Sequence, residues 1–375
     1  MKEDEEIIVG KEPPILFLKL KQFLKSRNGK ILLIVLGIFV LAILVLIYNL
    51  LWLNNKPENP KTVTWTPRSI TKTPTPTPTP QLVANPYNGA YVEPEMAERR
   101  AVAVMIENHP DARPQFGLSL ADIVYEMVTE GGITRFLAIF ATNDPAKVGP
   151  VRSARTSFLS WVLEYDAAYA HVGGSADALE NIKVMGIKDL DQFSNASAYW
   201  RDTSRKVAIE HTMYTNVGKL RQLFTHKKWS PERAAFEPWQ FSDDISLSER
   251  PESQEEIIPY ENEYLVRWVY QKNENAYLRK NVNQNAIDAS TNKEILAKNV
   301  VVLKMRTTQI VNSAGKKVAK VETTGKGKGY ILQNGKKLEI TWQKEAVNKR
   351  LKLLLADNSE VRFVRGLIWI AILPI

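Results

Sequence analysis

The chain contains no cysteine among its 375 residues. This absence excludes disulfides, thiolate metal ligands and cysteine nucleophiles, and it excludes a lipid anchor attached to a cysteine. Histidine is scarce too: the four histidines show no metal-ligand spacing such as H-x-x-x-H. We therefore predict no metal and no cofactor, because a zinc site would need a tertiary convergence that the sequence does not show.

Familiar catalytic and nucleotide-binding motifs are also missing. The sequence has no G-x-S-x-G elbow, no G-x-x-x-x-G-K-[ST] loop and no dinucleotide glycine fingerprint. The net charge of +9 suits nucleic acids or anionic membranes, yet no zinc-finger spacing, RNA-binding aromatic motif or basic-region heptad is present. We predict no nucleic-acid partner, and the sequence leaves open whether the protein is an enzyme.

One long run carries no charged residue. Residues Ile31–Leu53 are mostly apolar and would span about 35 Å as a helix, enough to cross a bilayer. Five basic residues precede the run and no acid lies among them: Lys19, Lys21, Lys25, Arg27 and Lys30. The rule that positive loops face the cytoplasm then predicts a cytoplasmic tail over 1–30 and a transmembrane helix over 31–53. The membrane is thus a predicted partner through Ile31–Leu53, with the C-terminal bulk extracytoplasmic.

Residues 54–86 form a predicted linker rich in proline and threonine. Eight of the 20 prolines fall there, and its repeated Thr-Pro pairs favour an extended polyproline II spacer.

Residues 87–245 predict an α/β domain. Mostly apolar strands are expected over 101–107, 135–142 and 167–173. Between the first two, an apolar stripe at helical spacing predicts a helix that begins at Ser119 and stops at Gly131 and Gly132. Alternating strands and helices favour a sheet covered by helices.

Residues 262–375 predict a smaller antiparallel β-rich domain, with an acidic interdomain loop over 246–261. Short strand patterns alternate with turn sequences, and Asn334-Gly335 is a strong hairpin signal. The stretch TGKGKGY is expected to be a loop or bulge. Trp342 and Trp369 are expected to pack in the core rather than to stack on a sugar.

The stretch GPVRSARTSFLSWV places two arginines beside Ser153, a predicted helix N-cap. Arginines that cluster at loop or element ends suit bidentate contacts with phosphate or carboxylate. The candidate ligand-binding arginines are Arg113, Arg135, Arg152, Arg155, Arg201 and Arg205. The alternative is a structural ion-pair network with the acids Asp122, Glu126, Glu130 and Asp202, and both interpretations stay open.

The carboxylates Asp122, Glu126 and Glu130 follow at i, i+4 and i+8 of the predicted helix. A solvated helix face is the default interpretation, and Glu130 is better placed to meet Arg135. Asp122 and Glu126 remain candidate ligand-site residues, as does Ser175, which follows His171 and two glycines at a turn suited to an anion. The candidate catalytic residues are His171, His211 and Glu130.

Several stretches resemble the YerB family of bacterial extracytoplasmic proteins, also called DUF3048. They include AVMIENHPDARPQFGLSLADIVYE, VGPVRSAR, YAHVGGS and GLIWIAILP, and the resemblance covers about residues 95–375. It implies an extracytoplasmic α/β domain followed by a smaller β-rich domain, commonly in lipoproteins, with no established activity. Near His211 the family tends to carry Pro-His-Asn, whereas this chain has Glu210 and Thr212 around the histidine.

The layout is also loosely similar to cell-wall glycopolymer ligases of the LytR-CpsA-Psr type, whose arginines hold a lipid-linked pyrophosphate. We therefore predict a membrane-anchored, non-catalytic envelope protein that binds a wall polymer or a lipid-linked phosphate. In this hypothesis Arg152 and Arg155 clamp the anion, and Ser153 donates to it. A transferase or hydrolase of phosphate-linked wall polymers, and a scaffold whose β domain recruits a protein partner of unknown identity, remain alternatives.

Overall fold

The computed structural model describes residues 24, 26–54, 81–311, 315 and 317–375. The chain divides into two compact units, Met1–Thr77 and Pro78–Ile375. Most of the predicted tail (1–30) and linker (54–86) lies outside the described residues.

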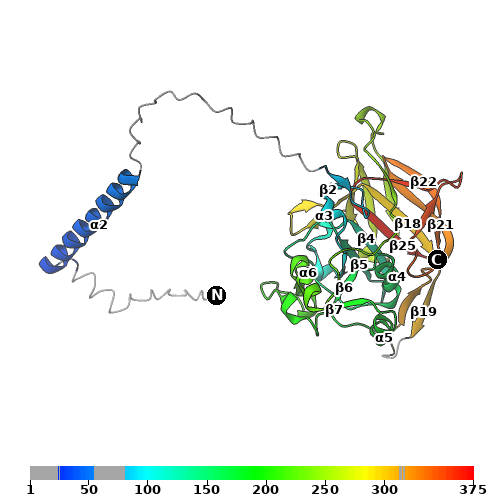
Figure 1. Ribbon diagram of the computed structural model, residues 1–375, viewed down its shortest axis with the longest axis horizontal. Helices are drawn as coiled ribbons and strands as arrows, with labels where there is room; N and C mark the ends of the chain where they lie inside the picture. Colours follow the sequence, from blue (N-terminus) through cyan, green and yellow to red (C-terminus); the bar gives the residue numbers. More distant parts are fainter. Residues whose placement is uncertain (1–23, 25, 55–80, 312–314, 316) are drawn as a thin grey trace, which may run out of the picture. The chain divides into compact units, whose positions relative to one another are not determined.

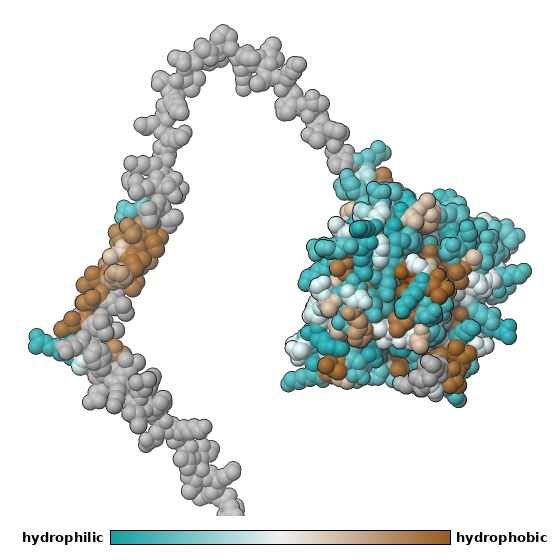
Figure 2. Space-filling view, turned by 60° about the horizontal axis from the view of Figure 1, so that its bottom comes forward, coloured by the Kyte–Doolittle hydropathy of each residue, from teal (hydrophilic) through white to brown (hydrophobic). Residues whose placement is uncertain are grey.

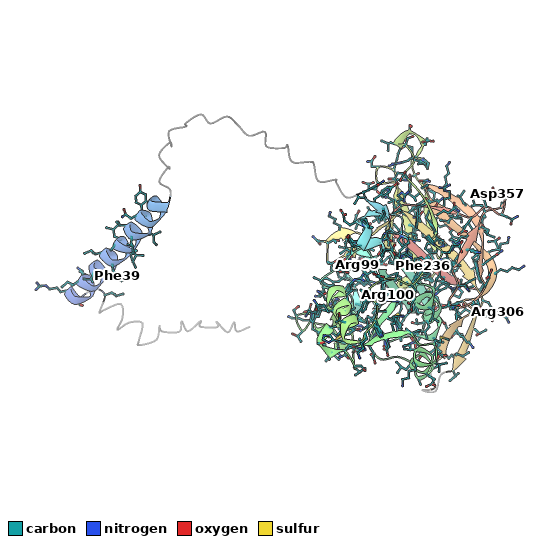
Figure 3. All side chains as sticks on the ribbon, viewed as in Figure 1. Phe39, Arg99, Arg100, Phe236, Arg306 and Asp357 are labelled. Carbon is teal, nitrogen blue, oxygen red and sulfur yellow. The ribbon has the colours of Figure 1, made fainter. Side chains whose placement is uncertain are left out.

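The first unit contains one long helix, α2 (Arg27–Asn54), at the position of the predicted membrane span. Large apolar side chains are exposed along it, among them Ile38, Phe39 and Leu44 (Figures 2 and 3). Among the described residues, no helix has both the length and the hydropathy of a membrane span.

Ten strands of the second unit form one mixed sheet (Figure 1). From edge to edge they are β23 (Lys352–Leu354), β22 (Lys336–Lys344), β21 (Gly325–Gln333), β18 (Asn299–Met305), β25 (Ile368–Pro374), β4 (Ile123–Val128), β5 (Thr134–Phe140), β3 (Val102–Glu107), β6 (Ala168–His171) and β7 (Lys188–Asp191). The strand that comes last in the chain, β25, runs parallel to both of its neighbours in the sheet, β18 and β4. Strands from both predicted domains therefore share one sheet, and the division at 246–261 stays a prediction.

Helices cover both faces of this sheet at the end formed by the N-terminal segment. The helices of the second unit are α3 (Pro94–Ala97), α4 (Thr156–Glu164), α5 (Ala176–Val184) and α6 (Val217–His226). Alternate residues of β3 enter two separate core clusters, because successive side chains of a strand point to opposite faces. We call the cluster on the α6 side the first core cluster and the cluster on the side of α4 and α5 the second. The apolar face of α6 packs in the first cluster, and those of α4 and α5 pack in the second.

A second sheet packs against the first core cluster. Its strands are β11 (Glu255–Ile258), β12 (Val266–Gln271), β13 (Ala276–Asn281) and β14 (Gln284–Asn285), with β17 (Leu296–Ala297) also paired to β13. Trp268 of β12 lies edge-on against Trp369 of β25, with ring centroids 5.3 Å apart. Shorter pairs are β1 (Val83–Ala84) with β2 (Tyr91–Val92), β8 (Tyr199–Arg201) with β9 (Met213–Thr215), β10 (Gln240–Ser242) with β24 (Arg362–Val364), β15 (Ile287–Asp288) with β16 (Lys293–Glu294), and β19 (Thr307–Val311) with β20 (Lys317–Val321).

The mixed α/β, strand-rich architecture confirms the expected fold class at that level. The expected strands over 101–107, 135–142 and 167–173 are β3, β5 and β6. The hairpin at Asn334-Gly335 joins β21 to β22, and both residues have positive φ, 52° and 68°.

The predicted helix after Ser119 is wrong, since this segment forms strand β4. β4 lies between β25 and β5 and is buried on both faces. A strand buried on both faces has consecutive apolar residues, and such a run also fits the apolar stripe of a helix. Ile123 and Met127 enter one core cluster and Val124 enters the other.

The glycine-rich stretch TGKGKGY is also not a loop, because its glycines lie within β21. A Cβ on Gly329 would lie 2.3 Å from the carbonyl oxygen of Val302, and one on Gly327 would lie 2.6 Å from Nε1 of Trp342. These glycines allow β21 to pack closely, and Trp342 and Trp369 are buried in the core as expected. Strand β11 likewise lies within the segment 246–261 that was expected to be a loop.

Candidate functional site

Two of the candidate arginines share one carboxylate. Nη2 of Arg135 lies 3.4 Å from Oε2 of Glu130, and Nε of Arg155 donates to Oε1 of the same residue. Burial, reinforced by the neighbouring Arg155, lowers the pKa of Arg135 to about 10. Burial raises the pKa of Glu130, but the two guanidiniums outweigh it and leave that pKa below its ordinary value. These residues form the internal ion-pair network that the sequence left as an alternative.

The loop that carries Arg152 does not begin a helix at Ser153. Helix α4 starts at Thr156 with Arg155 as its N-cap, so the predicted cap is wrong. The loop is instead held in an extended conformation by two β-bridges, Ile106 to Val151 and Ala154 to Gly174. The helix therefore begins only after these bridges.

Arg201 and Arg205 bind mainly backbone oxygens. Nη1 of Arg201 donates to the Ile209 carbonyl. Arg205 donates to the Asp111 carbonyl (2.9 Å) and to the Tyr214 hydroxyl (2.6 Å). Arg205 therefore ties the loop after β3 to the segment around β9.

Asp122 and Glu126 lie inside the fold rather than on a solvated face, because β4 occupies the middle of the sheet. Asp122 accepts hydrogen bonds from the backbone N–H groups of Ala141 (2.6 Å) and Thr142 (2.9 Å). Burial raises the pKa of Asp122. Glu126 pairs with the buried Arg279, with 2.9 Å between Oε1 and Nη2.

His171 is fully buried and uses both ring nitrogens internally, toward Asp189 Oδ1 (3.0 Å) and the Gly173 carbonyl (2.8 Å). Ser175 caps α5 without a side-chain cap bond. It shares with Arg155 a cavity of about 290 Å³.

A different group of residues converges where β3 ends, and we call it the histidine cluster: Glu107, His109, Asp111, Arg152 and His211. Glu107 is the last residue of β3, and its buried carboxylate accepts from Nε of Arg152 and faces Nδ1 of His211, both at 2.8 Å. The imidazoles of His109 and His211 stack, with centroids 4.8 Å apart. Sequence reasoning identified Arg152 and His211 but missed the other three. Their only signal was the alternation of Glu107, His109 and Asp111 immediately after a strand.

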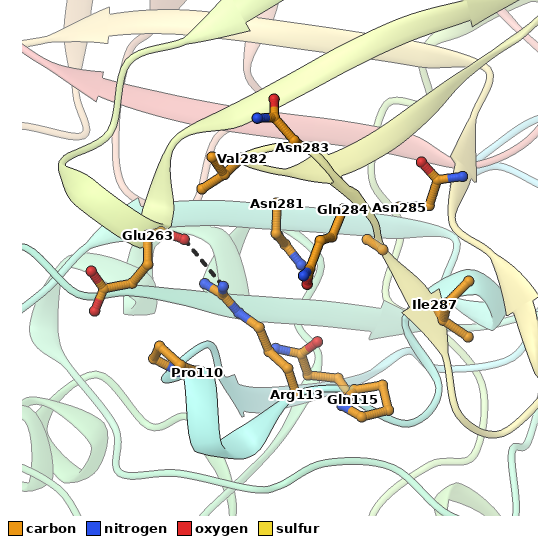
Figure 4. A pocket seen from close by; sticks show the side chains of 12 residues that line it. Pro110, Arg113, Gln115, Glu263, Asn281, Val282, Asn283, Gln284, Asn285 and Ile287 are labelled. Atoms are coloured by element: carbon orange, nitrogen blue, oxygen red, sulfur yellow. Dashed lines mark hydrogen bonds between the residues drawn. The ribbon is translucent and has the colours of Figure 1, made fainter.

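A cavity lies next to the same loop. Its volume is about 860 Å³, and Pro110, which separates His109 from Asp111, lines it. The polar side chains that line it are Arg113, Gln115, Glu263, Asn281, Asn283, Gln284 and Asn285 (Figure 4). We call it the amide-lined cavity.

Arg113, a predicted ligand residue, lines the amide-lined cavity together with Asn281 and Gln284 (Figure 4). Its guanidinium donates to neutral oxygens: the side chain (3.2 Å) and carbonyl (3.2 Å) of Asn108 and the carbonyl of Glu263 (3.1 Å). Burial and the charge of Arg279 lower the pKa of Arg113.

Comparison with known proteins agrees with this architecture. Residues 88–230 match the N-terminal domain of a protein family of unknown function, DUF3048, and residues 257–370 match its C-terminal domain. The chain belongs to the DUF3048 family. A relative from Bacillus subtilis (strain 168), named "Putative lipoprotein YerB", is 32% identical over 291 residues, which cover 77% of this chain and 86% of the relative.

A solved structure is similar to this DUF3048 chain as well. The crystal structure of the YerB protein from Bacillus subtilis matches with a TM-score of 0.67 and 30% sequence identity. The match covers 76% of this chain and 95% of the YerB chain in the crystal.

Proposed function

We propose that this DUF3048 protein is a membrane-anchored, extracytoplasmic protein of the bacterial envelope that binds an anionic, wall-associated ligand without turning it over. The observation that carries the binding proposal is Arg113 in the amide-lined cavity. Arg135, Arg152 and Arg155 each pair with a glutamate. Arg113 has no carboxylate partner among the described residues, so its charge is available to a ligand.

The chemistry of the amide-lined cavity indicates a class of ligand. A partly desolvated guanidinium favours a phosphate or a carboxylate, because hydrogen bonds between ions gain strength away from water. Carboxamides both donate and accept hydrogen bonds, which suits the hydroxyl and amide groups of a sugar or a peptide. A phosphate-linked wall polymer or a peptidoglycan fragment carries both kinds of group.

The test is equilibrium binding to the full chain in detergent micelles. The probes are a glycerol phosphate oligomer, a muropeptide and a polyprenyl phosphate, which separate polymer, peptidoglycan and lipid-linked sources. Losing a charge-assisted hydrogen bond costs about 1.5–3 kcal/mol, so we expect Arg113→Gln to weaken binding by roughly 10- to 100-fold.

The matched control is Arg306→Gln, the same change at an exposed arginine labelled in Figure 3. We expect it to bind as the wild type does. Equal affinities of the wild type and Arg113→Gln for every probe would overturn the proposal.

The location rests on the sequence and on the relative named as a lipoprotein. Without a cysteine, this chain needs another anchor, and the charge-free run Ile31–Leu53 offers one. We expect the full chain to remain in membranes after an alkaline carbonate wash, and a variant lacking residues 27–54 to be released. Release of both would exclude the anchor.

One contact favours a second candidate, a transferase or hydrolase acting on phosphate-linked wall polymers. Glu107 holds His211 at 2.8 Å, next to Arg152, so an acid–base pair lies beside a cation. Turnover of a phosphate-linked glycan that disappears in His211→Asn would favour this candidate over binding alone.

A further inference from the structure

Three potential metal ligands converge in the histidine cluster. One ligand atom from each of His109, Asp111 and His211 can be chosen so that all three lie within 4.8 Å of one another. Oδ2 of Asp111 lies 3.6 Å from Nδ1 of His109 and 4.0 Å from Nε2 of His211. Two imidazoles and one carboxylate thus lie close together, although 102 positions separate the two histidines in the sequence (211 minus 109).

A hydrogen bond to Glu107 fixes the orientation of the His211 ring. A carboxylate can only accept, so Nδ1–H of His211 donates to Oε2 of Glu107 at 2.8 Å. The lone pair of Nε2 is then directed to the side where Asp111 lies. Metal-binding histidines characteristically donate their second ring N–H to a carboxylate or carbonyl, which fixes the tautomer. Glu107 and His211 are both buried, so this arrangement is built into the fold.

The remaining two side chains can move to complete a coordination sphere. The side chains of His109 and Asp111 are 34% and 58% exposed. Metal–nitrogen and metal–oxygen bonds of about 2.0–2.2 Å require ligand atoms less than about 4.4 Å apart. Because the imidazoles of His109 and His211 stack, and Nδ1 of His109 accepts from the backbone N–H of Asp111 at 3.3 Å, His109 must rotate out of this arrangement to reach the same ion, while His211 stays in place.

We infer that His109, Asp111 and His211 bind one divalent transition-metal ion, with Glu107 as the positioning residue behind His211. Imidazole ligands favour Zn²⁺ and its neighbours in the first transition row over Mg²⁺ or Ca²⁺. Three protein ligands leave at least one position open for water or an exogenous oxygen donor. This goes beyond the proposed anion site, because it uses none of the side chains that line the amide-lined cavity.

The test is a titration of the full chain, stripped with chelator in detergent micelles, with ZnCl₂ by calorimetry and with CoCl₂ by visible absorption. We expect one equivalent of either metal to bind, and the visible bands of Co²⁺ to show nitrogen and oxygen ligands. Asp111→Asn and His109→Ala, at accessible positions that leave the core intact, should each weaken Zn²⁺ binding at least tenfold. The matched control His226→Ala removes an exposed histidine at the end of α6 and should bind as the wild type does.

Glu107→Gln tests the positioning role. We expect it to weaken Zn²⁺ binding by about 10- to 100-fold while the bound Co²⁺ keeps the same visible bands, since the three ligands remain. The inference is overturned if the wild type binds neither metal, or if His109→Ala and Asp111→Asn bind as tightly as the wild type. Arg113→Gln should leave Zn²⁺ binding unchanged, so failure of the anion site and failure of the metal site are separable.

Discussion

Replacing Glu126 by glutamine tests a buried ion pair that joins strand β4 to strand β13 of the second sheet. Oε1 of Glu126 lies 2.9 Å from Nη2 of Arg279, and its other oxygen accepts from Nε1 of Trp369 at 3.0 Å. Both charged side chains are nearly inaccessible, with 0% and 2% exposed. The guanidinium also lies over the rings of Phe136 (5.3 Å) and Trp369 (5.0 Å).

The expected cost follows from burial. Removing one partner of a buried pair leaves an uncompensated charge and costs about 3–5 kcal/mol. The compact unit, residues 78–375, contains both core clusters and can be studied alone. With a urea slope of about 3 kcal/mol per molar, a loss of about 4 kcal/mol moves the unfolding midpoint of Glu126→Gln down by about 1.3 M.

A double-mutant cycle separates the pair from its surroundings. Arg279→Met alone strands the carboxylate and should cost about as much as Glu126→Gln. The double variant removes both charges while the glutamine still accepts from Trp369, so it should be less destabilised than the sum of the single variants by about 3 kcal/mol. Additive losses would refute the argument that the two charges stabilise each other.

Two further predictions concern packing and charge. Gly329→Ala should lower the free energy of unfolding by about 2–3 kcal/mol, because the new Cβ would meet the Val302 carbonyl; an unchanged urea midpoint would show that β21 can shift away. The hydrogen bond from Lys147 lowers the pKa of Asp202 from its ordinary value of 3.8 to about 2 in the folded state. The ionised carboxylate therefore stabilises the fold above about pH 4, and this stabilisation is lost as the pH falls through about 2. Asp202→Asn should therefore be less stable than the wild type by about 1 kcal/mol at pH 7, with the gap closing toward pH 2, as thermal unfolding over that pH range would show. A gap that stays constant with pH would contradict this account.

Much of the strand content could be predicted from local sequence. β3, β5 and β6 are apolar runs, and Asn334-Gly335 supplies the backbone conformation that a tight hairpin needs. β4 could not be predicted, because the spacing of Ile123 and Met127 fits a helical stripe and also one face of a strand. Only its neighbours decide between the two, and one of them, β25, comes more than 200 residues later in the chain.

The site shows the same division between local and distant information. The arginines could be identified as candidates, but whether a guanidinium is free depends on which carboxylate folds against it. Arg155 meets Glu130, whereas Arg113 meets only neutral oxygens. His211 meets Glu107 across 104 positions of sequence, which no spacing rule can detect.

The central claim is that an anion binds Arg113 in the amide-lined cavity. The most direct measurement is the affinity of the variant Gln284→Glu for the three probes: the glycerol phosphate oligomer, the muropeptide and the polyprenyl phosphate. The side chains of Gln284 and Arg113 both line this cavity (Figure 4). This nearly isosteric change adds a carboxylate to the cavity wall, where its charge opposes the binding of an anion. Gln222→Glu, the same change at an exposed position of α6, is the control. The account predicts that Gln284→Glu loses at least tenfold in affinity for the bound probe and that Gln222→Glu loses none, whereas equal affinities of the two variants would contradict it.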